Sequence, residues 1–557
     1  MTALTDLVRQ RALTDPDGLA VVDVTDGRSR TWTWHELADQ TDRAASALLR
    51  LGVRPGEPVM LQLPNIGELV VLCLATLRIG AVCCPVMPIF REREMEQVLR
   101  RARPRVLVVP DEFRGRDHMD ETEGLVRTPG RGEQGRGGSL EHVVVVAAEG
   151  SGHRALPAPD QGPAWHSLTT LLAEPPADAS ILDDRRPADD CFAQLMFTSG
   201  TSGEPKGVLH RADTLGRAAA ATAARLRLTE RDRVHVAAPM AHHSGFLYGM
   251  WLSLLLGTTQ VLQPVWEART ALRALREWGG TFIQAATPFL MDLVTAVERG
   301  AEPASGLRMF VVTGAAVPRA LAERASRVLG ASVCTAWGST ETCMGTLSAP
   351  DDDPALVWGT DGRPLDGVEL RIVDGLDRQL PRGIEGNLIV RSAFAFTGYF
   401  QRPEWDTEIF TTDGWYRTGD LAVLERSGYL RITGRVKDVI NRGGEKVPVS
   451  EIEQVLYRHP AVEDVAVVAM PDDRLGERAC AFVVETRGRQ LDFPEMQRHL
   501  NEAGVAKHYW PEQLQIITKL PRNAAGKVQK FVLREQARGL KPLTTAANEQ
   551  PSRRVIA

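Results

Sequence analysis

Short apolar runs rich in β-branched residues alternate with helix-length amphipathic segments as far as Val368. The strand-like runs are Val59–Leu63, Val106–Val109, His142–Val146, Val234–Ala238, Thr281–Gln284 and Met309–Thr313. The amphipathic segments include Trp34–Leu51, Ala268–Trp278 and Pro318–Leu329. Continuous apolar strands between helices indicate largely parallel sheets that are covered by helices. The pattern therefore predicts an α/β body.

Beyond Val368, strands and turns replace this alternation. Strands are predicted at Val368–Val373 and Asn387–Val390, and a βαββαβ-like tail follows Gly434. The tail has predicted helices at Ser450–Tyr457 and Pro494–Glu502 and predicted strands at Val465–Val468, Ala479–Val484 and Leu514–Ile517. About a hundred residues is near the usual size of an independent domain. We expect one domain over residues 1–435, a second over 436–540 and a flexible tail over 541–557.

Residues 114–190 differ in composition from the rest of the chain. They are rich in Gly, Arg, Pro and Asp and contain one predicted strand, near Val143–Val146. Such a composition favours irregular structure over a packed core. We expect most of this segment to form a long surface loop, and no function is assigned to it.

Composition excludes several classes of protein. With 43% hydrophobic and 25% charged residues over 557 positions, the chain is globular and large enough for several packed units. Its net charge of −5 argues against a nucleic-acid partner. The seven Cys are odd in number and scattered, which favours free thiols in a reducing compartment over disulfides or a Cys/His metal motif.

The chain lacks the signals of export and membrane insertion. Residues 1–10 have no apolar signal-peptide core. The apolar stretch Ile66–Met87 is interrupted by Glu68 and Arg78, and Phe246–Leu256 is too short to cross a bilayer. We expect a cytoplasmic protein.

A run of hydroxyls and glycines follows the apolar stretch Phe192–Phe197. It reads Thr198-Ser199-Gly200-Thr201-Ser202-Gly203-Glu-Pro-Lys206. A backbone of this kind can wrap phosphate oxygens, with hydroxyls donating hydrogen bonds and Lys206 adding positive charge. The spacing does not match GxxxxGK[ST], so the loop predicts phosphate binding but not a P-loop triphosphatase.

Lysine is rare in this chain, and three of its lysines lie in glycine-containing motifs. Of 66 basic residues only eight are Lys, and Lys206, Lys437 and Lys527 are the three. Where Arg supplies most charge, a retained Lys more often needs its compact ammonium. Lys527 lies near the end of the predicted second domain, far in sequence from the phosphate loop. A catalytic charge on a separate domain predicts a site that is completed by domain closure.

In their order, these motifs resemble those of the acyl-adenylate-forming superfamily, which includes acyl- and aryl-CoA ligases, adenylation domains of peptide synthetases and beetle luciferase. The resemblance runs from Leu37 to Arg534, and locally it is nearest to medium-chain and alicyclic carboxylate:CoA ligases, such as cyclohexanecarboxylate:CoA ligase. Its motifs are the phosphate loop, Trp337-Gly-Ser-Thr-Glu-Thr, Tyr416-Arg-Thr-Gly-Asp, Gly434-Arg-Val-Lys-Asp and Pro521–Lys530. The resemblance implies a large N-terminal domain of stacked α/β sheets with a β-barrel-like part, and a small mobile α+β C-terminal domain.

The resemblance also implies ATP, Mg²⁺ and CoA as ligands and assigns residues to them. Glu341 and Thr201 would hold Mg²⁺, Lys527 would bridge the carboxylate and the α-phosphate, and Lys437 would be the hinge. Gly443 and Gly444 would line the thiol tunnel. The nucleotide site would comprise Thr198, Ser199, Gly200, Thr201, Ser202, Gly203, Lys206, Gly314, Ala315, Ala316, Ala336, Trp337, Gly338, Ser339, Thr340, Asp420, Ile432, Arg435 and Lys527.

Elementary chemistry supports these roles independently. Attack of a carboxylate on the α-phosphorus brings anions together, so cations that face them stabilise the transition state. An ionised acceptor such as Asp420 suits the two ribose hydroxyls. Taken alone, Asp420 is also consistent with a turn residue and Glu341 with an acidic residue at a helix N-terminus.

The acyl pocket is predicted from the segment Ala238–Gly249 and two others. The candidates are His242, His243, Gly245, Phe246, Thr313, Gly314, Trp337, Gly338, Thr342 and Cys343. By the resemblance His242 would gate the thiol tunnel and also count as catalytic, and His243 would face a ring substituent. The alternative is that the two histidines cap the following helix. Relatives that select amino acids have an Asp near here to hold the ammonium, and this segment has none.

These features predict a carboxylate:CoA ligase that makes acyl-AMP from a small alicyclic, aryl or short- to medium-chain acid and then a thioester. Three alternatives stay open. One is aryl acid adenylation for loading an acyl carrier protein, and another is nitrite adenylation with diazotisation of an aromatic amine. The third is a non-catalytic acyl or nucleotide sensor.

Overall fold

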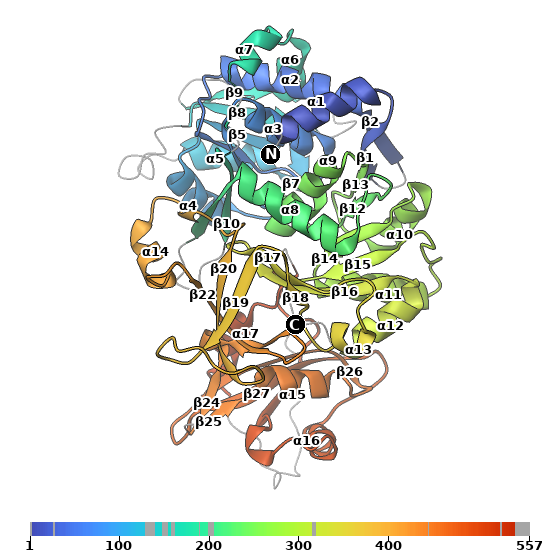
Figure 1. Cartoon of the computed structure of the whole chain (residues 1–557), viewed down its shortest axis with the longest axis vertical. Helices are drawn as coiled ribbons and strands as arrows, with labels where there is room; N and C mark the ends of the chain where they lie inside the picture. Colours follow the sequence, from blue (N-terminus) through green and yellow to red (C-terminus); the bar gives the residue numbers. More distant parts are fainter. Residues whose placement is uncertain are drawn as a thin grey trace.

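The computed structural model describes residues 3–25, 28–127, 140–147, 154–157, 162–185, 187–188, 190–198, 205–314, 319–443, 445–523 and 526–540. The predicted fold class is confirmed. A large N-terminal body built on two extended sheets and a smaller antiparallel sheet adjoins a small α+β domain formed by the C-terminal part of the chain (Figure 1).

The first large sheet has eight strands among the described residues, in the order β21-β11-β10-β4-β3-β5-β8-β9. From β10 to β9 the pairings are parallel, whereas β10, β11 and β21 pair antiparallel. The bounds are β3 Pro58–Leu61, β4 Val82–Pro85, β5 Val106–Pro110, β8 His142–Val146, β9 Ala164–Ser167, β10 Phe192–Thr198, β11 Lys206–Arg211 and β21 Gly398–Tyr399.

The second large sheet has nine strands in the described part of the chain, in the order β18-β17-β16-β15-β14-β12-β13-β1-β2. Its centre is parallel and its two ends are antiparallel. The bounds are β1 Leu19–Thr25, β2 Arg28–Thr33, β12 Val234–Val236, β13 Gln260–Leu262, β14 Phe282–Ala285, β15 Met309–Val312, β16 Ser332–Ser339, β17 Cys343–Leu347 and β18 Arg363–Pro364.

One hydrophobic core joins the two large sheets. Alternate strand residues enter it, such as Leu61 and Val108 from the first sheet and Val311 from the second. Their neighbours Met60 and Phe310 face separate cores on the outer sides. Both faces of the parallel strands are therefore buried, which explains why the sequence shows continuous apolar runs there.

Helices cover these faces. Residues of α8 and of the π-helix η1 belong to the shared core, and α10, α11 and α12 cover the outer face of the second sheet. The N-terminal helices are α1 Leu4–Thr14, α2 Trp34–Arg50, α3 Gly67–Arg78, α4 Glu92–Ala102, α8 Ala212–Leu226, η1 Ser244–Trp251, α9 Leu252–Leu256, α10 Ala268–Glu277, α11 Thr287–Glu298, α12 Arg319–Leu329, α13 Pro354–Val357 and α14 Pro403–Ile409.

An antiparallel sheet leads to the small domain. It has the order β19-β20-β22-β23, with β19 Val368–Val373, β20 Glu385–Ser392, β22 Tyr416–Leu424 and β23 Leu430–Arg435. In the small domain, β24 Ile440–Arg442, β25 Glu445–Val447, β26 Val462–Asp472, β27 Gly476–Glu485 and β28 Gln513–Ile516 form one sheet. Its helices are η2 Val436–Asp438, α15 Val449–Leu456, α16 Phe493–Glu502, η3 Lys507–Tyr509 and α17 Lys530–Ala537. Its two faces carry their own cores.

The prediction of a mostly irregular segment over 114–190 is wrong for its described residues. Beside β8 and β9, these form α5 His118–Arg127, α6 Leu168–Ala173, α7 Ala179–Asp183 and a short β6–β7 hairpin, Glu112–Phe113 with Arg116–Asp117. Leu168, Leu171 and Leu182 bury against the shared core. Such short helices depend on tertiary packing, so their own sequences carry little signal. Among the described residues, no helix is long and apolar enough to cross a membrane.

We expect Asn65 to stabilise the strand end that precedes His242. Its side chain donates to the carbonyl oxygens of Val236 and Ala238, at 3.2 and 3.0 Å, and accepts from the Met240 amide at 2.7 Å. Asn65→Ala leaves these buried groups unpaired and should lower the free energy of unfolding by about 3 kcal/mol. The measurement is urea unfolding followed by tryptophan fluorescence. The exposed Asn501→Ala is the matched control, and equal midpoints for both variants would contradict the role.

Candidate active site

The phosphate loop joins two antiparallel strands. Thr198 at the end of β10 pairs with Lys206 at the start of β11. Ser199, Gly200, Thr201, Ser202 and Gly203 lie outside the described residues. The connection is a hairpin and not the strand–loop–helix of a P-loop, in agreement with the spacing of its Lys.

Lys206 lies beside an aromatic pair and close to Glu341. Its Nζ is 4.8 Å from the ring centroid of Tyr399 and 5.5 Å from that of Trp405. The Tyr399 hydroxyl donates to Glu341 Oε1 at 3.0 Å. The structure therefore brings Lys206 and Glu341 together through Tyr399, a residue that the sequence analysis missed because it belongs to no quoted motif.

The turn that carries Glu341 is tightly built. Thr342 Oγ1 accepts from the Ser339 amide at 3.0 Å, and the Glu341 carbonyl accepts from the Phe396 amide at 2.7 Å. A Cβ at position 338 would lie 2.1 Å from the Cys343 carbonyl oxygen, so the β16–β17 connection requires Gly338. These contacts fix where the Glu341 side chain leaves the backbone.

Asp420, the carboxylate of the predicted nucleotide site, is held through both of its oxygens. It is 4% exposed, and its Oδ2 accepts from Trp337 Nε1 and its Oδ1 from Arg435 Nε, both at 2.9 Å. Trp337 is predicted as a nucleotide-site residue from its place in the motif. Its indole N–H is committed to Asp420, which gives this tryptophan a polar role that its place in the motif did not indicate.

A second carboxylate, which the sequence analysis missed, lies near Asp420. Asp361 accepts from the Ile432 amide at 2.8 Å. Loss of hydration on burial, together with the Asp420 charge, raises the pKa of Asp361 to about 6. Asp361 thus orients the backbone of Ile432, one of the predicted nucleotide-site residues.

Lys527 reaches this group of residues from the small domain. Its turn is closed by Asn523, whose side chain accepts from the Lys527 amide at 2.9 Å. A Cβ added to the neighbouring Gly526, which has φ +83°, would lie 3.2 Å from Pro288 at the start of α11, so the two domains are in contact here. The Lys527 side chain keeps some exposed surface, but the surrounding protein removes much of its hydration. This loss of hydration is the main cause, and the charge of Arg435 the second cause, of a pKa lowered to about 8.

Lys437, the predicted hinge residue, lies in η2 at the junction of the two domains. Loss of hydration and the neighbouring Arg435 lower its pKa. Asp438 is paired with Arg534 of α17 at 2.6 Å. The junction therefore connects β23, which carries Arg435, to the last helix of the small domain.

His242 lies close to Lys527 and two residues before the start of the π-helix η1. Its Nδ1 accepts from the Ser244 amide at 3.2 Å, so the capping alternative holds for this histidine. Loss of hydration and the charge of Lys527 lower the pKa of His242 to about 4. His242 is therefore neutral at neutral pH and lies where the two domains meet.

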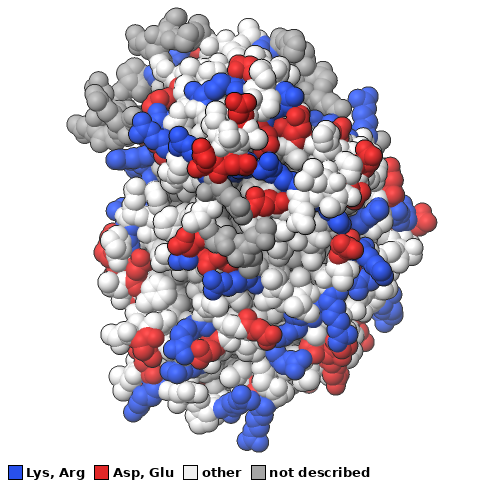
Figure 2. Space-filling view, turned by 45° about the horizontal axis from the view of Figure 1, so that its top comes forward, with Lys and Arg blue, Asp and Glu red and all other residues white. Residues whose placement is uncertain are grey.

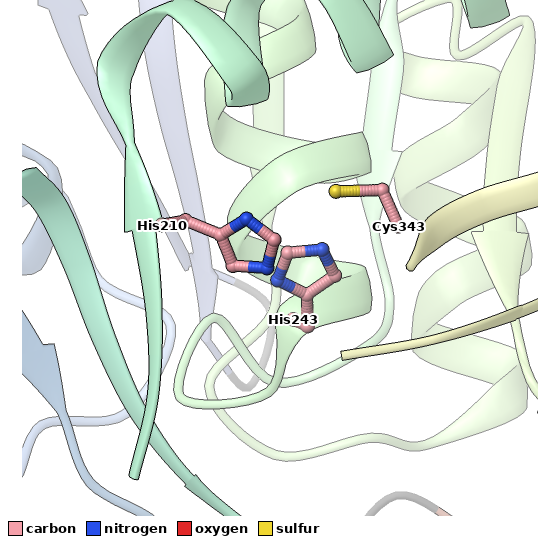
Figure 3. Close-up of side chains that lie close together, drawn as sticks. All are labelled: His210, His243 and Cys343. Atoms are coloured by element: carbon pink, nitrogen blue, oxygen red, sulfur yellow. The ribbon is translucent and has the colours of Figure 1, made fainter. Parts of the chain in front are cut away.

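His243 turns away from that junction into the N-terminal domain. Its Nδ1 donates to Gln194 Oε1 at 3.0 Å, and it makes no capping contact. Its ring stacks on His210, which the sequence analysis missed, and Cys343 lies beside both (Figure 3). Gly245 is required because a Cβ there would lie 2.3 Å from the Pro239 carbonyl oxygen.

Other predicted pocket residues have different positions. Phe246 is fully buried in the shared core against Trp251. Thr313 and Gly314 follow β15, with φ +84° at Gly314, and Ala336 and Thr340 lie on and just after β16. Ala315 and Ala316 are outside the described residues.

Of the two predicted thiol-tunnel residues, the structure describes Gly443, which lies on the small domain. Gly443 directly follows β24, a strand that lies at the far side of the small domain from β10 and β11 (Figure 1). It adopts φ +61°, and its amide donates to the Leu475 carbonyl at 2.8 Å. Gly444 lies outside the described residues.

The sequence comparisons match this architecture. Residues 8–400 match the family described as AMP-binding enzyme, and residues 451–527 match the AMP-binding enzyme C-terminal domain.

The chain belongs to the AMP-binding enzyme family. Over 534 residues it is 34% identical to the medium-chain fatty-acid–CoA ligase of Escherichia coli strain K12, covering 96% of this chain and 90% of the relative. It is also 34% identical to a salicylyl-CoA synthase / salicylate adenylyltransferase of Streptomyces sp., covering 93% and 91% of the two chains. The ATP-bound structure of MatB from Rhodopseudomonas palustris superimposes with a TM-score of 0.83 at 27% identity, covering 97% and 99%.

This AMP-binding enzyme is therefore an acyl- or aryl-CoA ligase homologue of the ATP-dependent adenylating type. The CoA ligases of this family use ATP and CoA with a carboxylate. On the face shown in Figure 2, acidic and basic side chains are interspersed over the surface.

We expect Lys527 to depress the pKa of His242 across the domain boundary. Lys527→Met removes the positive charge, so the pKa of His242 should rise, because the imidazolium no longer faces an ammonium. NMR titration of the imidazole C–H resonances measures the pKa of His242 in both proteins. His235 is the internal control, because burial alone lowers its pKa to about 4, without Lys527. An unchanged His242 pKa would mean that the domains do not meet in this way in solution.

Proposed function

We propose that this enzyme activates a small alicyclic, aryl or short- to medium-chain carboxylic acid as acyl-AMP and passes the acyl group to CoA. The observation that carries the proposal is the position of Lys527, on the small domain, beside Asp420, Arg435 and His242 of the large domain. In that arrangement the Lys527 ammonium adjoins residues of the predicted ribose site and of the predicted acyl pocket. The named activities of the two relatives agree with it.

In the first half-reaction, a carboxylate oxygen of the acid attacks the α-phosphorus of ATP, and pyrophosphate leaves. Lys527 would neutralise the approach of two anions and then the charge that develops on the α-phosphate. Asp420 would accept hydrogen bonds from the ribose hydroxyls while Arg435 and Trp337 hold its carboxylate. The phosphate hairpin, with Thr198 and Lys206 at its base, would hold the leaving pyrophosphate.

The position of Glu341 is compatible with a magnesium ligand. Among the described residues, Tyr399 is the hydrogen-bond donor to its carboxylate, and oxygen ligands are those that Mg²⁺ prefers. Bound Mg²⁺ would supply positive charge to the phosphate oxygens. Tyr399 would hold the carboxylate in the rotamer that faces them, with Thr201 as the second predicted ligand.

In the second half-reaction, the thiol sulfur of CoA attacks the acyl carbonyl carbon, and AMP leaves. We propose that the small domain rotates about Lys437 for this step, which would withdraw Lys527 and bring Gly443 and Gly444 to the tunnel. The loss of the Lys527 contact would leave His242 free to move as the gate. A neutral His242 costs less to move than a buried cation would.

A second candidate, aryl acid adenylation with transfer to a carrier protein, is favoured by one observation. The Streptomyces relative is named a salicylate adenylyltransferase as well as a CoA synthase. Both candidates share the first half-reaction, so the acceptor decides between them.

We expect Lys527→Met to lower the rate of acid-dependent pyrophosphate release by about 100-fold or more, the usual effect of removing one transition-state charge contact. Lys519→Met, an exposed lysine of the same domain, should leave the rate unchanged. Because the pKa of Lys527 is depressed to about 8, the wild-type rate should fall as pH rises through 8, where the ammonium is lost. A Lys527→Met enzyme with wild-type rates would refute the role.

One screen identifies both the acid substrate and the acyl acceptor. Pyrophosphate release is measured with ATP and Mg²⁺ over aliphatic, alicyclic, aryl and hydroxy- or aminoaryl acids, each with and without CoA. We expect one acid class to give turnover that continues only with CoA. A single turnover that CoA does not relieve would favour carrier-protein loading, and release with nitrite and an aryl amine would favour diazotisation.

A further inference from the structure

Three potential metal-ligating side chains from three separate segments meet inside the N-terminal domain. His210 comes from β11, His243 directly precedes η1, and Cys343 begins β17. One ligand atom from each lies within 4.8 Å of the others (Figure 3). The three side chains are 0%, 4% and 1% exposed. Buried polar groups usually have hydrogen-bond partners, so three of them gathered at one buried position require an explanation.

Hydrogen bonds settle which nitrogen of each imidazole carries the proton. His210 Nε2 lies 2.6 Å from the Thr340 carbonyl oxygen, and His243 Nδ1 lies 3.0 Å from Gln194 Oε1. Both oxygens are acceptors only, so both nitrogens must be the N–H donors. The opposite nitrogens, His210 Nδ1 and His243 Nε2, therefore present bare lone pairs.

Those two lone pairs have no hydrogen-bond partner. Both His210 Nδ1 and His243 Nε2 are buried and unpaired. In Figure 3 both nitrogens are on the same side of the stacked rings as the sulfur of Cys343. Two unpaired buried acceptors beside a thiol are a set of groups that favours a cation.

We propose that His210 Nδ1, His243 Nε2 and Cys343 Sγ bind one zinc ion. Two neutral imidazoles and one thiolate are ligands that zinc accepts, with a fourth position left open. Gln194 and the Thr340 carbonyl would be the outer partners that fix the tautomers, as is usual for metal-bound histidine. Bonds of about 2.0 to 2.3 Å place tetrahedral ligand atoms about 3.5 Å apart, so zinc would draw the three side chains together from the 4.8 Å within which their ligand atoms lie.

Zinc binding would displace the thiol proton. Without metal, Cys343 donates a hydrogen bond to the Phe394 carbonyl at 3.2 Å, and burial raises the pKa of the thiol. Formation of the zinc–sulfur bond breaks the S–H bond and releases one proton to solvent, and no electron is transferred. The site would hold a net charge of +1, from Zn²⁺ and one thiolate.

The site would adjoin the acyl pocket and the nucleotide motif without belonging to the adenylation chemistry. His243 and Cys343 are also predicted pocket residues, and Thr340 precedes the predicted magnesium ligand Glu341. The zinc proposal does not depend on the proposed function, because binding is measured in the absence of ATP and acid.

The test uses the full-length protein after removal of metals with a chelator. Zn²⁺ is titrated in competition with a chromogenic chelator, and Co²⁺ serves as the spectroscopic probe because a cobalt–thiolate bond gives a charge-transfer absorption. We expect one equivalent of either metal per chain and, for zinc, an affinity that rises with pH because a proton is released.

Variants test whether the metal is bound by the triad or by other Cys and His side chains. Cys343→Ser should abolish the charge-transfer band, and His210→Gln and His243→Gln should each weaken zinc binding at least 10-fold. Gln194→Leu, which touches no metal, should weaken it about 10- to 100-fold. Cys334→Ser, another buried free cysteine in the N-terminal domain, is the matched control and should bind as the wild type does. Melting curves without metal show whether each variant is folded.

Two results would overturn the proposal. One is the absence of stoichiometric Zn²⁺ and Co²⁺ binding by the folded wild-type protein. The other is metal binding that Cys343→Ser reduces no more than Cys334→Ser does. In either case the two lone pairs would be acceptors for a buried water or for a donor group of the acyl substrate.

Discussion

Burial of both faces of two largely parallel sheets is the constraint on which the remaining structure depends, because one face of each sheet packs on a shared core and the other on an outer core. A parallel strand has no solvent-exposed side, so each strand residue is committed to one of two cores. The loops at the strand ends are then the parts of the N-terminal body that remain free for polar chemistry. The phosphate hairpin, the segment at His242 and the turn at Glu341 all leave strands in this way: β10, β12 and β16.

Electrostatics connects these loops to the small domain. Asp420 is the acceptor for Trp337 and Arg435, and Lys527 approaches the same group from the other domain. The positive charges of Arg435 and Lys527 lie near the negative charge of Asp420. The protein excludes part of the water there, and the lower local dielectric strengthens each electrostatic interaction. A substrate that brings phosphates to this space would find its counter-charges already oriented.

Much of the fold was predictable because periodicity reports burial directly. The predicted strand His142–Val146 has the observed bounds, and the predicted helix Trp34–Leu51 extends one residue beyond α2. The prediction for residues 114–190 was wrong because short helices show no periodicity in the sequence. Helices α6 and α7 are too short to show a period, and Leu182 in α7 finds its place only by packing against the core. For the candidate site, motifs predicted Lys206, Glu341, Asp420 and Lys527, which local sequence marks, but they gave no sign of Tyr399 beside Glu341 or of Asp361 near Asp420.

The sequence by itself determined the α/β class, the two-part chain and the order of the phosphate, ribose and lysine motifs, because local composition and spacing carry that information. Only the tertiary structure decided that Tyr399 holds Glu341, that Asp361 lies near Asp420, and that His210 meets His243 and Cys343. These contacts join residues from different segments of the chain, 33 to 133 positions apart. Sheet order and side-chain packing bring them together, and neither is written in any short stretch of the chain.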